Sequence, residues 1–334
     1  MSICISVYNG ERFLKTCLDS VVNQTIKEIE IILVNDGSTD LSLEIMHEYR
    51  RRFPNIVRVF SQDNRGLAQG RQTGIENARG EFIGFLDTDD YLSKDACEKM
   101  YTAAIKHNVD IVECMSLMDD KIIQSKYEGI EKTSKILKDY FSNFNIPSML
   151  WLRLYRRSLF VRPLMPNMHV NNEDVFAFPC LLFMAENIYY LKEQLHYYTS
   201  PHDNELSVMS EIINKNCDEE KIIRSRVKTL AVISHIKNFI GENNIKNNYS
   251  EVFLTFTART ILSFCLYEFQ SLSIRESIKI ACEKTGANLK DLDKFSKNLR
   301  GYNKILQKMI KYLGFKKTIL MYRIFKKLSS SVKV

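Results

Sequence analysis

Apolar runs alternate with helical patterns along about the first 115 residues of the chain. Short runs of β-branched, aliphatic and aromatic residues predict strands at 2–8, 30–34, 56–60, 82–86 and 110–115. Apolar positions at helical spacing predict helices at 11–25, 41–53, 67–78 and 94–107. The candidate N-caps of these helices are Asn9, Ser38 or Asp40, and Ser93. Repeated units of this kind predict an α/β fold, with a Rossmann-like, mostly parallel sheet and helices on both faces.

The pattern changes after about residue 116. A hairpin is expected at 118–127, a helix at 133–144, and short strands at 188–191 and 195–198. A further helix, capped by Asn171 or Asn172, is expected to run through Ala185. Beyond residue 211 the sequence is helical in character almost to its end. Two domains are therefore expected: an α/β domain over 1–210 and an all-α region over 211–334.

Polar clusters follow two of the predicted strands. Asn35-Asp36-Gly37-Ser38 ends the second, and Asp87-Thr88-Asp89-Asp90 ends the fourth. Parallel sheets bind ligands beyond the carboxyl ends of their strands, so both clusters are expected to face one crevice. Carboxylates there suit Mg²⁺ or Mn²⁺, and such a cation suits a diphosphate. Each cluster is also compatible with an ordinary turn that caps the next helix.

Glu173 and Asp174 open the apolar segment 175–184. Carboxylates in the first turn of a helix interact favourably with its dipole, which is one sufficient reason for their presence. The other interpretation is general-base catalysis, in which one carboxylate removes a proton and the other supports it. The two residues alone leave both interpretations open.

Charge is distributed unevenly along the 334 residues, whose formal net charge is +7. Residues 1–120 contain 13 Lys and Arg against 20 Asp and Glu, which argues against nucleic-acid binding by this part. Residues 301–334 contain nine Lys and Arg and no acidic residue, and their pattern is amphipathic. Such a segment fits either an anionic membrane surface or a terminal helix packed on its own domain.

Three further features narrow the class of protein. No apolar stretch is long enough to span a membrane, and no signal peptide is evident, so a cytoplasmic location is expected. The eight cysteines include no C-x-x-C pair, which favours buried thiols over a zinc site or disulfides. The dinucleotide motif G-x-G-x-x-G is absent after the first predicted strand.

Several ordered motifs over about residues 2–207 resemble those of family 2 glycosyltransferases with the GT-A fold, of the bacterial surface-polysaccharide type. They are Val7-Tyr8-Asn9, the 18–25 segment, the 30–40 segment around Asp36, Asn64-Arg65-Gly66 with Arg71 and Gly74, the 80–90 segment around Asp87, Trp151 to Tyr155, and Glu173-Asp174. The chain departs from the family pattern at Ser6, usually Pro, and at Asn35, often Asp. Neither position is a proposed ligand.

The resemblance implies roles for the matching residues. Asp89 would bind Mn²⁺ or Mg²⁺, Asp36 would hold uracil, and Asp174 would be the catalytic base with Glu173 beside it. Other residues would contact the nucleotide or donor: Val7, Tyr8, Asn9, Asn64, Arg71, Asp87, Thr88 and His202.

The expected enzyme is a metal-dependent inverting glycosyltransferase. It would move a hexosyl or N-acetylhexosaminyl group from a nucleotide-sugar donor, a UDP-sugar, to a glycan or lipid-linked acceptor in cell-surface polysaccharide synthesis. No nucleic-acid partner is expected, and residues 301–334 would provide any membrane contact. Two alternatives are a nucleotidyltransferase and a sugar-nucleotide-binding protein without turnover.

Overall fold

The computed structural model describes residues 1–143, 146–161, 163–166, 173–199, 219–243 and 274–285, and the single positions 253, 256, 257, 260, 261, 265, 287 and 319. The chain forms two compact units. The first consists of Met1–Leu137 and Ile146–Asn214, and the second of Lys138–Asn145 and Lys215–Val334. Residue 210, the predicted domain boundary, lies outside the described residues.

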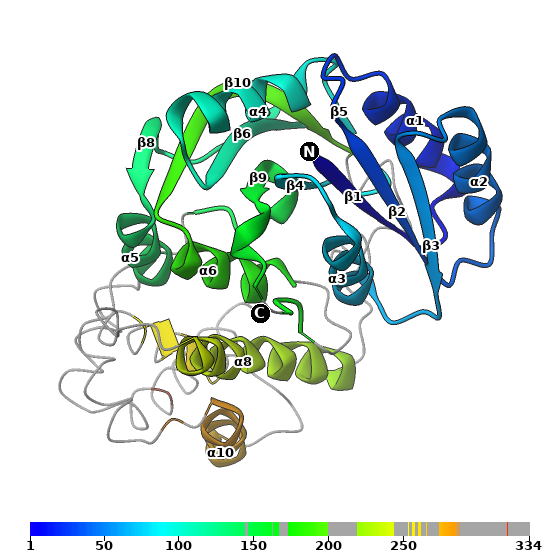
Figure 1. Ribbon diagram of the computed structural model, residues 1–334. Coiled ribbons are helices and arrows are strands. Elements are labelled where there is room, and N and C mark those ends of the chain that lie inside the picture. The colour runs from blue at the N-terminus through cyan, green and yellow to red at the C-terminus, as the bar shows by residue number, and fades with distance from the viewer. Residues whose placement is uncertain are drawn as a thin grey trace. The chain divides into compact units, whose positions relative to one another are not determined.

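The alternation predicted for the first 115 residues is confirmed (Figure 1). The strands are β1 (Ser2–Val7), β2 (Glu30–Asp36), β3 (Val57–Gln62), β4 (Phe82–Phe85) and β6 (Ile111–Met118). The helices between them are α1 (Glu11–Val22), α2 (Ser42–Arg52), α3 (Leu67–Asn77) and α4 (Ala96–His107). Strand β2 runs two residues beyond its predicted end, so Asp36 belongs to the strand itself.

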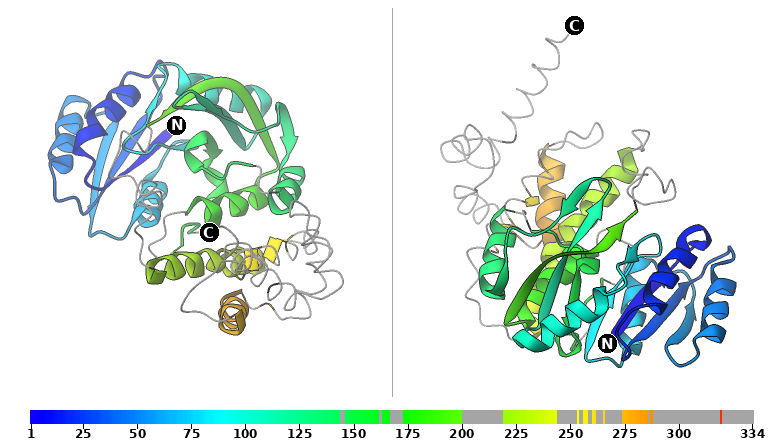
Figure 2. Two further views of the ribbon diagram at one scale, coloured as in Figure 1. Left: turned by 180° about the vertical axis from the view of Figure 1, so that it is seen from behind. Right: turned by 90° about the horizontal axis from the view of Figure 1, so that it is seen from above.

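The sheet has the strand order β3-β2-β1-β4-β9-β6-β10-β5. Strands β3, β2, β1 and β4 are parallel neighbours, whereas β9 (Arg153–Arg156) lies antiparallel between β4 and β6. Strand β10 (Asn187–Tyr198) is parallel to β6 and pairs with β5 (Tyr91–Leu92) at the sheet edge. Helices α1 and α2 cover one face of β1–β3 and α3 covers the other (Figure 1 and Figure 2).

The elements after residue 116 are of the types, helix or strand, that the sequence predicts there. Strands β6 and β7 (Lys121–Ile123) form the expected hairpin, and β8 (Gly129–Lys132) pairs with β10. Helix α5 spans Thr133–Asn143 and α6 spans Asp174–Met184. The two short strands expected at 188–191 and 195–198 are one strand, β10. Its register against β6 shifts between Tyr190 and His196, where the polar residues 192–194 separate the two apolar runs.

None of the predicted residues occupies the N-cap position of α1, α2 or α4, although Asp40 still bonds the first N–H of α2. The N-cap residues of α1, α2 and α4 are Gly10, Leu41 and Asp95, and none makes a side-chain capping bond. Asn9 Oδ1 accepts a hydrogen bond from the Thr39 N–H, 2.8 Å away. Asp40 does accept one from the Ser42 N–H at 3.0 Å, whereas Ser93 Oγ donates to Asp95. Asn171 and Asn172 lie outside the described residues.

Helix α3 explains the Gly66-x3-Gly70-x3-Gly74 spacing. A Cβ on Gly70 would lie 1.9 Å from Ser6 Oγ, and one on Gly74 would lie 3.0 Å from Cys4 Cβ. The two glycines therefore let α3 lie directly on β1, where a helix with bulkier residues would be held away. The close approach makes up for the small apolar surface of α3 and brings its other residues near the strand ends.

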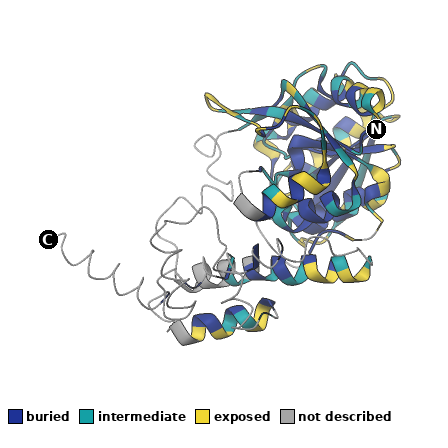
Figure 3. Ribbon diagram, turned by 90° about the vertical axis from the view of Figure 1, so that its left-hand side faces the viewer, coloured by how far each residue is buried: buried dark blue, intermediate teal, exposed yellow. Residues whose placement is uncertain are grey.

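The core of the first unit consists of strands that are buried on both faces. Residues Ile31–Val34 of β2 are all buried, and β1 is buried except for Ser6 (Figure 3). Helices α1 and α4 contribute one apolar side each, with Leu14, Leu18 and Met100 among the buried residues. This is the pattern of a sheet covered by helices on both sides.

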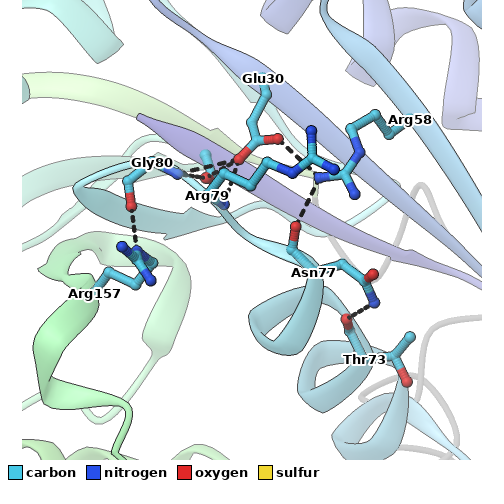
Figure 4. Close-up of polar contacts among 8 residues, drawn as sticks. Glu30, Arg58, Thr73, Asn77, Arg79, Gly80 and Arg157 are labelled. Carbon is cyan, nitrogen blue, oxygen red and sulfur yellow. Dashed lines mark hydrogen bonds and ion pairs between the residues drawn. The ribbon is translucent and has the colours of Figure 1, made fainter.

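Glu30 is the first residue of β2, and it joins several elements at the end of the sheet where β1 and β2 begin (Figure 4). Its Oε1 accepts hydrogen bonds from Ser2 Oγ at 2.6 Å, the Arg79 N–H at 2.6 Å and the Gly80 N–H at 3.1 Å. Its Oε2 accepts one from Arg58 Nη1 at 3.0 Å. Arg58 in turn donates to the Asn77 carbonyl at 2.7 Å, which ties the end of α3 to the sheet.

The described part of the second unit contains α8 (Glu219–Glu242) and α10 (Ile274–Thr285), which pack against each other. Ser234 Oγ of α8 donates to the Lys284 carbonyl of α10, 2.6 Å away. Of the helices in the described part, none is long and apolar enough to cross a membrane. Within 301–334 the structure describes Ile319, which is helical and fully buried.

Candidate active site

The strand order brings the two predicted carboxylate clusters to one edge of the sheet. Strand β1 lies between β2 and β4, and all three are parallel. Asp36 ends β2, Tyr8 and Asn9 follow β1, and Asp87 to Asp90 follow β4. The Leu86 N–H donates to the Cys4 carbonyl, which continues the β1–β4 pairing up to the Asp87 cluster.

Asp36 is almost fully buried and organises the loop after β3. Its Oδ1 accepts hydrogen bonds from Gln62 Nε2 at 2.7 Å and the Arg65 N–H at 2.9 Å, and its Oδ2 accepts one from the Gly66 N–H at 2.8 Å. Gly37 has a φ of +73°, and a Cβ there would lie 2.7 Å from the Asn64 nitrogen. A carboxylate has about four acceptor positions, and these three hydrogen bonds use three of them.

The other residues predicted to contact the nucleotide differ in exposure. Val7 is buried, Tyr8 is 53% exposed, and Asn64 is exposed beside Asp36 and Gly37. Asn9 has a φ of +48°, and its side chain joins the turn between β1 and α1 to Thr39. A Cβ on Gly10 would lie 3.3 Å from Thr88 Cβ, so Thr88 packs against the turn that follows β1. His202 lies outside the described residues.

Arg71 gathers three carboxylates that are distant in the sequence. Its Nη2 contacts Asp87 Oδ1 at 2.6 Å, and its Nη1 contacts Asp174 Oδ1 at 2.9 Å and also Glu173 Oε1. Arg71 comes from α3, Asp87 follows β4, and the other two open α6. Sequence reasoning assigned Arg71 to the donor, and it missed this direct pairing because 103 residues separate Arg71 from Asp174.

The two adjacent carboxylates differ in access. The Glu173 side chain is 2% exposed and that of Asp174 is 17% exposed, so Asp174 is the more accessible of the two carboxylates. Burial raises the pKa of Glu173 to about 7, with repulsion from Asp174 and Asp87 adding to the rise and Arg71 opposing it. Burial also raises the pKa of Asp174, although Arg71 and the Leu150 N–H oppose that rise.

Asp90 is the last residue of the Asp87–Asp90 loop, and its buried side chain contacts His196 of β10. Its Oδ1 accepts a hydrogen bond from the Thr199 N–H at 2.9 Å, and its Oδ2 is 3.3 Å from His196 Nε2. His196 Nδ1 lies 2.9 Å from Ser116 Oγ, and Trp151 stacks on the imidazole at a centroid distance of 4.2 Å. Burial lowers the pKa of His196 to about 3 and raises that of Asp90 well above its usual range. Both shifts favour the uncharged form of the group.

Thr199 joins Asp90 to the backbone of Asp89, the predicted metal ligand. The Thr199 hydroxyl donates to the Asp89 carbonyl, while its N–H bonds Asp90. Sequence reasoning gave His196 no role, although the alternation of β10 could have indicated an inward-facing histidine. The Asp89 side chain itself is partly exposed.

The described carboxylates do not form a divalent-cation site by themselves. Among the described residues, no three His, Cys, Asp or Glu side chains are placed to hold one. Mg²⁺ and Mn²⁺ accept one or two carboxylates when phosphate oxygens and water complete the shell. Three carboxylates around Arg71 also leave an excess of negative charge, which favours a cation nearby. Asp89 with a donor diphosphate therefore fits such an ion.

Comparisons with known proteins agree with this arrangement. The model of the family described as "Glycosyl transferase family 2" matches residues 2–160. Over 270 residues the chain is 34% identical to "Putative glycosyltransferase EpsH" of Bacillus subtilis (strain 168), covering 77% of this chain and 73% of that protein. It is 37% identical over 175 residues to "Uncharacterized glycosyltransferase EpsJ" of the same organism, covering 48% and 49%.

Solved structures extend the likeness to the fold. The crystal structure of S. aureus TarS 1-349 has a TM-score of 0.56 at 19% identity, covering 98% of this chain and 91% of that one. The same protein in complex with UDP-GlcNAc has a TM-score of 0.58 at 16% identity. The family model covers β1 to β9 with the Asp36 and Asp87 clusters and ends before Glu173 and Asp174. The match to this family favours sugar transfer over the two alternative activities. The chain therefore belongs to glycosyltransferase family 2, has a GT-A fold and is a glycosyltransferase.

Proposed function

We propose that this enzyme transfers a hexosyl or N-acetylhexosaminyl group from a UDP-sugar to an acceptor hydroxyl, with inversion at the anomeric carbon. The observation that carries the proposal is the accessible Asp174 carboxylate, held by Arg71 beside Asp87 at the carboxyl edge of the sheet. The complexes of TarS with UDP and with UDP-GlcNAc support the choice of donor. The EpsH relative supports a glycosyltransferase of bacterial origin.

Asp174 would act as the general base. Its carboxylate takes the proton of the acceptor hydroxyl while the acceptor oxygen forms a bond to the anomeric carbon and the bond to the diphosphate oxygen breaks. The raised pKa of Asp174, caused first by burial, makes it a stronger base than an ordinary aspartate. Arg71 and the Leu150 N–H both contact Oδ1, so they hold the carboxylate in one orientation.

The remaining residues would bind the donor. The fourth acceptor position of Asp36 would accept the uracil imide N–H, and the exposed Tyr8 offers a face for the base. Val7, Asn9, Asn64 and Thr88 lie at or just after the same strand ends, and Asp87 shares Arg71 with the general base Asp174. His202 would approach the diphosphate from the segment after β10. A divalent cation bound by Asp89 and the diphosphate would offset the charge of the departing nucleotide.

The cellular setting follows from the relatives and the charge distribution. We infer a role in cell-surface polysaccharide synthesis, such as a capsule, at the cytoplasmic face of a membrane with a glycan or lipid-linked acceptor. The "Poly(ribitol-phosphate) beta-glucosyltransferase" of Bacillus spizizenii, 40% identical over 114 residues, supports a polymer of this kind as the acceptor. The basic segment 301–334 would provide membrane contact.

Two measurements test the proposal. A panel of sugar nucleotides is screened for nucleotide diphosphate release, and the best donor is then used with the Asp174→Asn variant. We expect the variant to bind UDP as the wild type does but to release UDP from the donor roughly a hundredfold more slowly. Equal losses in UDP affinity and in rate would show that Asp174 binds the donor or supports the fold instead.

A further inference from the structure

Arg153, the first residue of β9, is a fully buried cation that does not belong to the donor site. Its Nη2 forms an ion pair with Glu113 Oε2 of β6 at 2.5 Å. The guanidinium also lies over the Phe178 ring, 3.9 Å from its centroid. The side chain is 0% exposed, so neither substrate can touch it.

Two chains of contacts lead from Arg153 to Asp174. Its Nη1 donates to the Met149 carbonyl at 2.8 Å and its Nη2 to the Pro147 carbonyl at 2.5 Å, which fixes the turn before Leu150. The Leu150 N–H then donates to Asp174 Oδ1 at 3.2 Å. The second link runs through the backbone of α6, because Phe178, which the guanidinium contacts, lies one helical turn after Asp174.

We propose that Arg153 is a positioning residue for Asp174, orienting its carboxylate through the 147–150 turn and through Phe178. This inference rests on the proposed role of Asp174 as the base. The planar fork of Arg can serve two carbonyls and a carboxylate at once, whereas the ammonium of Lys is a point charge. Burial raises the pKa of Asp174, and the Arg153 charge is among the groups that oppose the rise.

The stability of the fold does not by itself explain the Arg153–Glu113 ion pair. Burying two charges costs free energy that their attraction barely recovers, so packed apolar residues of similar volume serve a core equally well. The pair is therefore better explained by the geometry that it imposes on the turn and on α6.

Arg156, at the other end of β9, provides a matched control. It pairs with Glu81 at 2.8 Å and with Asp110 at 3.3 Å, and its guanidinium lies 4.7 Å from the Phe82 ring centroid. Arg156 thus makes the same kinds of contact as Arg153, but its partners lie away from the 147–150 turn. Arg156→Met should lower stability while leaving the turnover rate within about twofold of the wild type.

The test compares Arg153→Met, Arg156→Met, Asp174→Asn and the double variant Arg153→Met/Asp174→Asn. The probes are UDP binding by calorimetry and UDP release from the donor selected by the panel. We expect Arg153→Met to lower kcat by about ten- to a hundredfold with the UDP Kd changed by no more than about twofold. The double variant should be no slower than Asp174→Asn, because Arg153 acts through that carboxylate.

The outcomes separate the two proposals. If Asp174→Asn keeps the wild-type rate, the assignment of the base is wrong and this inference is wrong with it. If Asp174→Asn is slow but Arg153→Met turns over like Arg156→Met, only the positioning role is overturned. Additive losses in the double variant would also overturn it. Should Arg153→Met fail to fold, Arg153→Lys keeps the charge and is judged by the same criteria, with a loss in kcat expected.

Discussion

Replacing Glu30 by Gln should destabilise the first unit at neutral pH. The Glu30 side chain is 17% exposed and accepts four hydrogen bonds, one of them from the Arg58 guanidinium. A Gln oxygen at the Oε1 position can keep the three bonds from Ser2, Arg79 and Gly80, but the amide NH₂ then faces Arg58. The variant loses one charge-assisted hydrogen bond and the negative charge that strengthens the other three. We expect this to lower the free energy of unfolding by about 2 kcal/mol.

The pH dependence gives this prediction a second readout. Burial raises the pKa of Glu30, but the bonds from Ser2, Arg79, Arg58 and Gly80 outweigh it and leave the pKa below its ordinary value. The stabilisation is therefore complete above the unfolded-state pKa of about 4.3 and is lost as pH falls through the lower folded-state value. The difference between wild type and Glu30→Gln should shrink over that acidic window.

Urea unfolding followed by tryptophan fluorescence measures the effect. Trp151 is the single tryptophan of the chain and lies in the first unit, so its signal reports the unit that contains Glu30. A loss of about 2 kcal/mol should lower the urea midpoint by about 0.7–1 M. Glu28→Gln, an equal charge change at an exposed side chain two residues earlier, is the control. Equal midpoints for the Glu30 and Glu28 variants at pH 7 would refute the reasoning.

Three other predictions concern function. Asp89→Ala should abolish divalent-dependent transfer yet keep the wild-type circular dichroism spectrum, and metal-dependent activity close to normal would remove Asp89 as the ligand. Asp36→Ala should weaken UDP binding by about 1.5–3 kcal/mol in calorimetry, from the loss of a charge-assisted bond and of the loop that Asp36 holds. The chain should pellet with anionic liposomes at low salt and dissociate as salt rises, and deletion of 301–334 should prevent pelleting while sparing UDP release. Failure of the truncated enzyme to fold would instead favour a packed tail, a result that the buried Ile319 would explain.

Much of the candidate site could be predicted because its residues lie at the ends of strands that the local sequence pattern identifies. Apolar runs made β2 and β4 recognisable, and Asp36 and Asp87 are placed by the ends of those strands. The sequence pattern did not predict the hydrogen bonds that Asp36 accepts. Its three hydrogen bonds to Gln62, Arg65 and Gly66 come from a different strand and loop.

The sequence by itself determined the alternation of strands and helices, the carboxylates at the strand ends and the family, because periodicity and motif spacing are local properties of the chain. Only the tertiary structure decided that β9 enters antiparallel between β4 and β6, and that Arg71 pairs with Asp87, Glu173 and Asp174. It also decided the burial of the Arg153–Glu113 and Asp90–His196 pairs. These contacts join residues 16 to 106 positions apart, and their energies depend on burial and geometry that arise only when the sheet and α6 have assembled.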